Sequence, residues 1–278
     1  MAEIKIRACR NLSLTFSETD GGQGEYPTSR IQKGLLLNCG EETLCEEGLG
    51  FGVPLLKFKD REIFPGRART TNSTVNGTTT IIANYELNLG KKLVVKGRKI
   101  KNRTVYEIED YFGRLHREHP ALRNTVDWWG NRLRKTLGVE GVFEEVEPAG
   151  NIAATYTISE DGATLHVSMD FARVKKEGLA EIIVANEQGA NYFAGYRDSD
   201  GKALLGEKIG SWDEVTAGRA SFIDSGNRVT FSLANVEKAK LLRGRELVSG
   251  RLAWAGLNYV LPPESTVFSY DITLGTFG

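Results

Sequence analysis

The sequence predicts a mainly β protein, a large antiparallel β-sandwich with a two-helix insertion near 104–137. Three observations lead to this fold class. Apolar residues recur at every second position in many short segments, which is strand patterning with one buried face. Turn signals separate these segments at short intervals. Helical spacing dominates a single region, so the sequence lacks the repeated strand–helix–strand units that build a parallel sheet.

The N-terminal part has the pattern of strands joined by polar turns. Leu12, Leu14 and Phe16 alternate with polar residues, as expected for a strand that buries one face. Asn76 and Gly77 give the strongest hairpin signal, because both residues tolerate the left-handed backbone of a tight two-residue turn. Strands are expected at 33–39, 52–59, 69–75, 78–89 and 91–98, the third and fourth of these forming the hairpin.

The apolar period changes in the middle of the chain. Between residues 105 and 115 the apolar positions are three or four apart, which is typical of an amphipathic helix. Thr104 and Glu107 have the spacing of a capping box at its start. Pro120 suits the first turn of a second helix, and Gly138 suits its C-terminal cap. Two helices are therefore expected, at about 104–118 and 120–137.

Strand patterning resumes after the helices and continues to the end. The expected strands are 142–146, 152–158, 164–171, 180–185, 192–196, 220–223, 229–233, 247–254, 257–261 and 266–274. Polar turns are expected at 160–162, 198–201 and 224–227. Short strands at this spacing are typical of an antiparallel sandwich.

The number of expected strands exceeds that of one immunoglobulin-like domain. Two arrangements remain open: a single sandwich over 1–278 that carries the helical insertion, or two sandwiches over 1–103 and 139–278. No stretch rich in Pro or Ser marks a linker between them, and this favours the single domain.

Composition limits the class of protein. Thirty-six basic and 36 acidic residues give a formal net charge of zero, which argues against a general nucleic-acid binder. No run approaches 18 apolar residues, and the N-terminus lacks a signal-peptide core, so a cytoplasmic protein without membrane spans is expected. Three cysteines, Cys9, Cys39 and Cys45, are an odd number and are expected to be free thiols. No cofactor is indicated.

The stretch EEGLGFGVPLLKF has glycines at 48, 50 and 52 and invites comparison with a phosphate-binding loop. A dinucleotide loop needs a different glycine spacing and a helix after it. Here Val53 precedes Pro54, and the residue before a proline is driven away from helical conformation. We therefore expect a backbone bulge, or a close approach of two backbones, that leads into the strand at 52–59. Glu46 and Glu47 lie beside it and leave open a place in a ligand groove.

Two further patterns have ordinary explanations. His116 and His119 have a spacing used in metal sites, but no third ligand is specified, and no metal site is expected. Basic residues cluster between 91 and 103. Lysines protect exposed strand edges, and that is the expected role of this cluster; anion binding is the alternative.

Aromatic, amide and carboxylate side chains gather in 185–201 and again in 210–214. Aromatic rings can stack on sugars, and two carboxylates about 5–9 Å apart would permit glycosidic acid–base chemistry. We therefore expect a carbohydrate ligand in this region. The candidate acids or bases are Glu187, Asp213 and Glu214, and the candidate ligand-binding residues are Trp212, Tyr196, Arg197, Asn186 and Arg219.

A very large sandwich with an aromatic and acidic groove resembles the supersandwich of aldose epimerases and several polysaccharide-acting enzymes. This resemblance is one of architecture, without a shared motif, and it implies a protein that binds or acts on sugars. The alternative is a non-catalytic structural protein whose loops bind another protein, with a large exposed apolar patch and a stable oligomer. The sequence leaves open whether the protein is an enzyme, and its oligomeric state.

Overall fold

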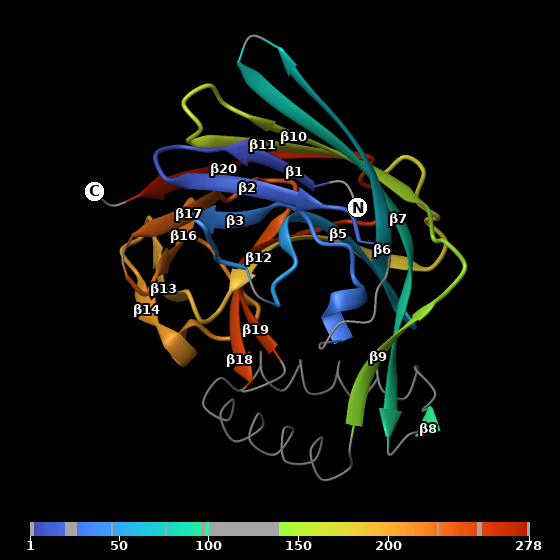
Figure 1. The fold of residues 1–278 in the computed structure, drawn as a ribbon. Helices are drawn as coiled ribbons and strands as arrows, with labels where there is room; N and C mark the ends of the chain where they lie inside the picture. Colours follow the sequence, from blue (N-terminus) through green and yellow to red (C-terminus); the bar gives the residue numbers. More distant parts are fainter. Residues whose placement is uncertain are drawn as a thin grey trace.

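A computed structural model describes residues 3–19, 27–45, 47–75, 77–95, 98–99, 139–226, 228–248 and 252–276. This part of the chain forms a four-stranded and a 16-stranded sheet, whose strand pairs are antiparallel (Figure 1). The small sheet contains β1 (Glu3–Arg7), β2 (Leu12–Ser17), β3 (Leu36–Cys39) and β4 (Glu42–Thr43). The large sheet contains β5 (Gly50–Phe58), β6 (Glu62–Val75), β7 (Thr78–Val95), β8 (Arg98–Lys99), β9 (Val139–Glu145), β10 (Asn151–Ile158), β11 (Thr164–Asp170), β12 (Leu179–Gly189), β13 (Phe193–Asp198), β14 (Ala203–Leu205), β15 (Asp213–Glu214), β16 (Arg219–Asp224), β17 (Val229–Ala234), β18 (Lys240–Val248), β19 (Leu252–Leu261) and β20 (Val267–Thr276).

The large sheet bends back on itself to form the layers of a sandwich. Its strand order is β14-β13-β16-β17-β20-β11-β10-β7-β6-β5-β12-β19-β18-β15, and β8 and β9 also pair with β7. Strands from opposite ends of this order meet: Arg245 on β18 donates a hydrogen bond to the carbonyl oxygen of Phe193 on β13, at 3.2 Å. The antiparallel sandwich expected from the sequence is confirmed.

Strands from the two halves of the chain pair with each other. β5 pairs with β12, and β7 pairs with β10, so strands that precede residue 100 and strands that follow residue 138 share one sheet. These pairings favour the single domain over two abutting sandwiches. The single domain stays a prediction.

The two helices expected at 104–118 and 120–137 lie outside the described residues. Within the described residues the helical elements are two short 3₁₀ turns, η1 (Pro27–Arg30) and η3 (Gly206–Ile209). None of the described segments forms a helix long and apolar enough to span a bilayer.

Two expected strand boundaries are wrong. The strand expected at 91–98 is the second half of β7, which exchanges its partner β10 for β9 near Gly90 and continues without a break. The strand expected at 247–254 falls across β18 and β19: Leu247 pairs with Ala253, so the chain folds back within that range. In the first case the alternation of apolar residues continues while the partner strand changes, and in the second it continues across a turn. Periodicity alone reveals neither event.

The expected turns at 76–77 and 224–227 are confirmed. Val75 pairs with Thr78, which leaves two residues for the hairpin turn, and Gly77 has a φ of 80°. At the other turn, the Asp224 carboxylate accepts hydrogen bonds from the backbone N–H groups of Arg228 and Val229. That carboxylate replaces the strand pairing lost where β16 ends and β17 begins.

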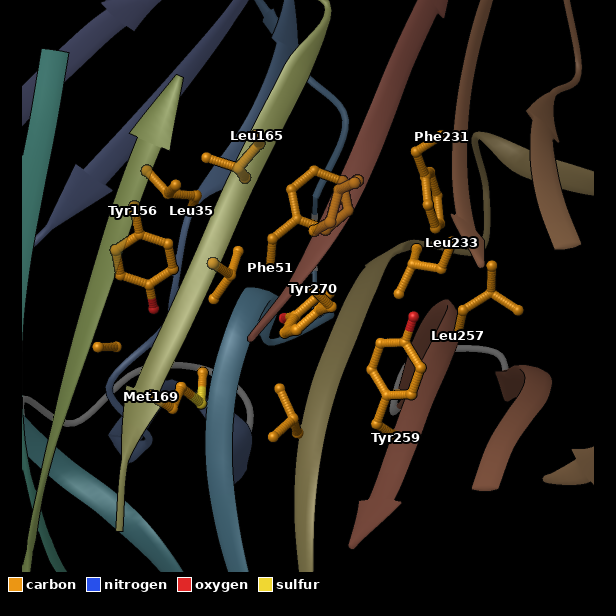
Figure 2. Packing of buried hydrophobic residues seen from close by; sticks show 14 of the residues in the cluster. Leu35, Phe51, Tyr156, Leu165, Met169, Phe231, Leu233, Leu257, Tyr259 and Tyr270 are labelled. Carbon is orange, nitrogen blue, oxygen red and sulfur yellow. The ribbon is translucent and has the colours of Figure 1, made fainter. Parts of the chain in front are cut away.

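Two apolar clusters lie on opposite faces of β5 and β12. The main core fills the interior of the sandwich and contains Phe51, whose ring meets Phe231 edge-on at 5.2 Å (Figure 2). The second cluster is smaller. It consists of Ile31, Leu49, Val53, Leu55, Leu89, Phe143 and Ala185.

A β-bulge at Gly52 separates these clusters. Phe51 and Val53 are two residues apart, and a regular strand would place them on the same face. The pairing of β5 with β12 shifts here: Val53 lies opposite Ala185, Phe51 lies opposite Asn186, and Gly52 is the extra residue. Gly52 has a φ of 73°, a left-handed conformation that glycine adopts without steric cost. The bulge expected from the glycine-rich stretch is confirmed.

Side chains satisfy the polar groups that the bulge removes from the sheet ladder. The hydroxyl of Tyr156 donates to the carbonyl oxygen of Gly52 at 2.6 Å, and the Gly52 N–H donates to Oδ1 of Asn186 at 3.1 Å. The same oxygen accepts a hydrogen bond from the Tyr270 hydroxyl at 2.7 Å. Burial raises the pKa of Tyr156 and Tyr270 well above the ordinary value, so both hydroxyls remain protonated donors.

Replacing Gly52 should test this account of the bulge. A Cβ at Gly52 would lie 2.6 Å from a ring carbon of buried Tyr156. We expect Gly52→Ala to lower the free energy of unfolding by about 2–4 kcal/mol, from backbone strain and overpacking together. Gly201→Ala is the matched control, since Gly201 has a φ of 86° and open space around it. It should cost about 1 kcal/mol in urea unfolding. Equal losses in the two variants would contradict the account.

Candidate functional site

A row of residues in register crosses four strands of the large sheet. Glu187 on β12 lies opposite Gly50 on β5 and Gly256 on β19, and Gly256 lies opposite Gly244 on β18. Residues paired across antiparallel strands direct their side chains to the same face. Glu187 is thus the one side chain in a row otherwise made of glycine. A Cβ on Gly256 would lie 2.8 Å from Cγ of Glu187, so glycine there leaves room for the glutamate stem.

The Glu187 carboxyl group is buried and hydrogen-bonded. The residue is 7% exposed, and its Oε1 accepts a hydrogen bond from Nδ2 of Asn258 at 2.9 Å. Burial raises the pKa of Glu187 to about 7; the hydrogen bonds from Asn258 and the Leu49 N–H, and the charge of Lys33, oppose this rise. A carboxyl group with such a pKa can give up or accept a proton near neutral pH.

Two tryptophans stack on the same face. The rings of Trp212 and Trp254 are 4.4 Å apart and inclined by 8°. Gly244 lies beneath them, since a Cβ there would lie 2.9 Å from the Trp254 ring and 2.9 Å from the backbone nitrogen of Trp212. Trp254 is buried and Trp212 is half-buried. The pair therefore forms an aromatic platform with Trp212 as the outer ring.

The platform and the carboxyl group are neighbours. Gly244 lies against the Trp254 ring and the Trp212 backbone, Gly256 lies beside the Glu187 stem, and these two glycines are cross-strand partners. Partners of this kind have side-chain positions roughly 5 Å apart. The structure thus brings together Glu187 and Trp212, two of the residues singled out in the sequence.

The other two expected acids lie on β15 and have surroundings of their own. Asp213 forms an ion pair with Arg243 at 3.1 Å, and the two side chains are 17% and 8% exposed. Glu214 is exposed and lines a separate open depression of about 440 Å³. The depression is lined by Glu214, Val215, Asn235, Val236, Glu237, Ala239, Lys240 and Leu241. The three expected acids therefore do not form one cluster.

The remaining expected ligand-binding residues lie on β12, β13 and β16. Asn186 is fully buried and points to the main core, on the face of β12 opposite to Glu187. Tyr196 is 1% exposed, so its ring offers no face for stacking; its hydroxyl donates to Asp198 at 3.1 Å. Arg197 on β13 and Arg219 on β16 are exposed.

Residues on β19 complete the site, although they are not among the site residues expected from the sequence. Trp254, Gly256 and Asn258 occupy alternate positions, and a strand directs alternate residues to one face. The aromatic ring, the gap above glycine and the amide that holds Glu187 therefore come from one segment, AWAGLN. An alternation of such different residues is the signal that could have identified them.

Other sequence features have structural roles or lie outside the described residues. Lys91 and Lys92 of the basic cluster form ion pairs with Glu62 and Glu144, at 3.3 and 2.7 Å. The Cys45 thiol is buried and donates a hydrogen bond to the carbonyl oxygen of Gly48 at 3.2 Å, and Cys9 and Cys39 are half-buried free thiols. Residues 116 and 119, where the histidine pair lies, and residue 46 are outside the described part. Among the described residues, no group of three or more His, Cys, Asp or Glu could hold a metal ion.

The raised pKa of Glu187 predicts a specific pH dependence of stability. Between pH 4.5 and about 7 the folded protein keeps this proton while the unfolded chain releases it. The free energy of unfolding should therefore fall by up to about 3 kcal/mol as the pH rises through this window. Glu187→Gln should remove this contribution, because its amide cannot ionise.

Urea unfolding at several pH values measures the effect as the difference between wild type and variant. Glu214→Gln is the control, since Glu214 is exposed, and should leave the pH profile unchanged. Parallel profiles for wild type and Glu187→Gln would contradict the raised pKa.

No protein-family model and no curated protein matches the chain. Similar solved structures include an alpha-N-acetylgalactosaminidase from Bifidobacterium bifidum, 6% identical over 99% of this chain, with a TM-score of 0.48. An alpha-mannosidase from Enterococcus faecalis is 8% identical over 98%, with a TM-score of 0.47, and a candidate aldose 1-epimerase from Escherichia coli is 8% identical over 99%, with 0.44. The chain spans 36%, 29% and 99% of these three chains. All three are named for sugar chemistry, but likenesses this weak show no family and no activity for this chain.

Proposed function

We propose that the protein binds a carbohydrate on the face that carries the Trp212–Trp254 platform and Glu187. The observation that supports this most is the placement of an aromatic platform beside a buried, proton-exchanging carboxyl group, above a row of glycines. Aromatic rings provide apolar contact area for the C–H face of a sugar. Ligand sites commonly combine such apolar surface with a few fixed polar groups.

If the protein is an enzyme that converts the bound sugar, Glu187 is the proposed catalytic group. Its oxygens are held by Asn258 and by the backbone of Leu49, so the carboxyl group keeps one orientation. With a pKa near 7 it can serve as general acid or general base to a sugar hydroxyl. Chemistry with two carboxylates has less support, because Asp213 is paired with Arg243 and Glu214 lines a depression whose lining does not include Glu187.

The alternative of a non-catalytic protein-interaction role has weaker support. It predicts a contiguous exposed apolar patch. Among the described residues, the large hydrophobic side chains that are exposed come from five different strands. They are Val75, Ile82, Leu205, Leu247 and Val267.

Calorimetric titration with a panel of mono- and oligosaccharides tests the proposal. For a sugar that binds, Trp212→Ala should weaken binding about tenfold or more, because truncating a central aromatic residue removes more than about 1.4 kcal/mol. Glu187→Gln should abolish turnover, where turnover occurs, and weaken binding less. Leu205→Ala is the control, since Leu205 is 73% exposed on β14.

Two results would contradict the proposal. One is that no sugar of the panel binds to the wild-type protein. The other is a sugar whose affinity is the same for wild type, Trp212→Ala and Glu187→Gln, because its site would then lie away from the platform.

A further inference from the structure

The backbone at Trp212 is strained, although the residue carries the outer ring of the platform. Its φ is 58°, in the left-handed region that bulky residues rarely adopt. Such a conformation persists when the surrounding structure fixes it, and it is common at functional sites. A specific set of contacts must therefore hold this residue in place.

The segment around Trp212 is attached to β18 before and after the strained residue. The N–H of Arg245 donates to the carbonyl oxygen of Gly210 at 2.9 Å, and the N–H of Val215 donates to that of Leu241 at 2.8 Å. Between these two bonds the chain makes the bend that lifts Trp212 over Gly244. Backbone bonds fix the ends of the bend.

The side chain of Arg243 holds the bend itself. Its Nε donates to the carbonyl oxygen of Ile209 at 3.1 Å, and its Nη1 donates to that of Glu214 at 3.4 Å. Its Nη2 donates to Oδ2 of Asp213 at 3.1 Å. These acceptors lie on both sides of Trp212 in the sequence, so a single planar guanidinium group bridges the bend.

The surroundings of Arg243 make this bridge rigid. Its side chain is 8% exposed, and its guanidinium carbon lies 5.2 Å from the centre of the Tyr196 ring, in a cation–π contact. Asp213 supplies the compensating charge that a buried guanidinium requires. Losing Asp213 would therefore leave a buried charge without its counterion and loosen the bridge.

We propose that Arg243 and Asp213 are positioning residues that fix Trp212 against Trp254 and thereby set the aromatic platform. The importance of the platform for ligand binding rests on the proposed function. The effect of Arg243 and Asp213 on the tryptophan geometry does not. Asp213, expected from the sequence to be an acid or base, acts here through Arg243 on the backbone that carries Trp212.

The near-parallel stack of the two indoles provides a direct readout. The transitions of two indoles at 4.4 Å couple, and the couplet is here the part of the circular dichroism spectrum that Trp212→Phe and Trp254→Phe each remove. Asp213→Ala should reduce the couplet strongly while the protein still melts cooperatively. Asp213→Asn keeps an acceptor for Arg243 but removes its counterion, so it should restore the couplet in part.

Glu214→Ala is the matched control. Glu214 is adjacent, its side chain is exposed, and it meets Arg243 through its backbone oxygen alone, so the couplet should be unchanged. Arg243→Lys keeps the charge but lacks the fork that reaches the carbonyl oxygens of Ile209 and Glu214, and it should lose the couplet. This variant decides the question if Asp213→Ala does not fold.

Affinity for a sugar from the panel gives the second readout. Asp213→Ala should weaken binding about as much as Trp212→Ala, roughly tenfold, and the double variant should bind no more weakly than either. A couplet that persists in folded Asp213→Ala and Arg243→Lys would overturn the proposal, because the backbone pairing of β15 would then suffice. If the couplet is lost but no sugar binds at all, the proposed function fails and the positioning role stands.

Discussion

The bulge at Gly52 is the constraint on which the core and the site both depend. Without the extra residue, Phe51 and Val53 would lie on one face of β5. Either the main core would then lose Phe51 or the second cluster would lose Val53. The bulge needs a left-handed backbone, which glycine supplies, and two polar partners, which Tyr156 and Asn186 supply. A buried polar group without a partner is costly, so these side chains are as necessary to the bulge as the glycine.

The same bulge places the glycine-rich segment beside Glu187. Beyond it, Gly50 meets Glu187 in register and Leu49 donates its N–H to the carboxyl group. The carboxyl group thus lies between the backbone just before β5 and the amide of Asn258 on β19. Keeping an ionised carboxylate there at neutral pH reduces stability. Groups that cost stability in this way are frequent at functional sites, since proton transfer needs a pKa near the working pH.

Features of the fold that depend on neighbouring residues could be predicted from the sequence. Features that depend on which strands pair could not. The hairpin at Asn76 and Gly77 and the bulge at Gly52 follow from residues adjacent in sequence, and both were predicted. The strand expected at 247–254 failed because its alternation continues across a turn. In the site, Glu187 and Trp212 were singled out by residue type. Their neighbours Trp254 and Asn258 were missed because strand order, which the sequence does not give, places β19 between β12 and β18.

The most direct test of the account is a crystal structure of the protein with a sugar selected from the binding panel. In that structure a sugar ring should stack on Trp212, with a hydroxyl group within hydrogen-bonding distance of Glu187. A sugar bound instead in the depression lined by Glu214, Asn235 and Lys240, with the tryptophan stack uncovered, would contradict it.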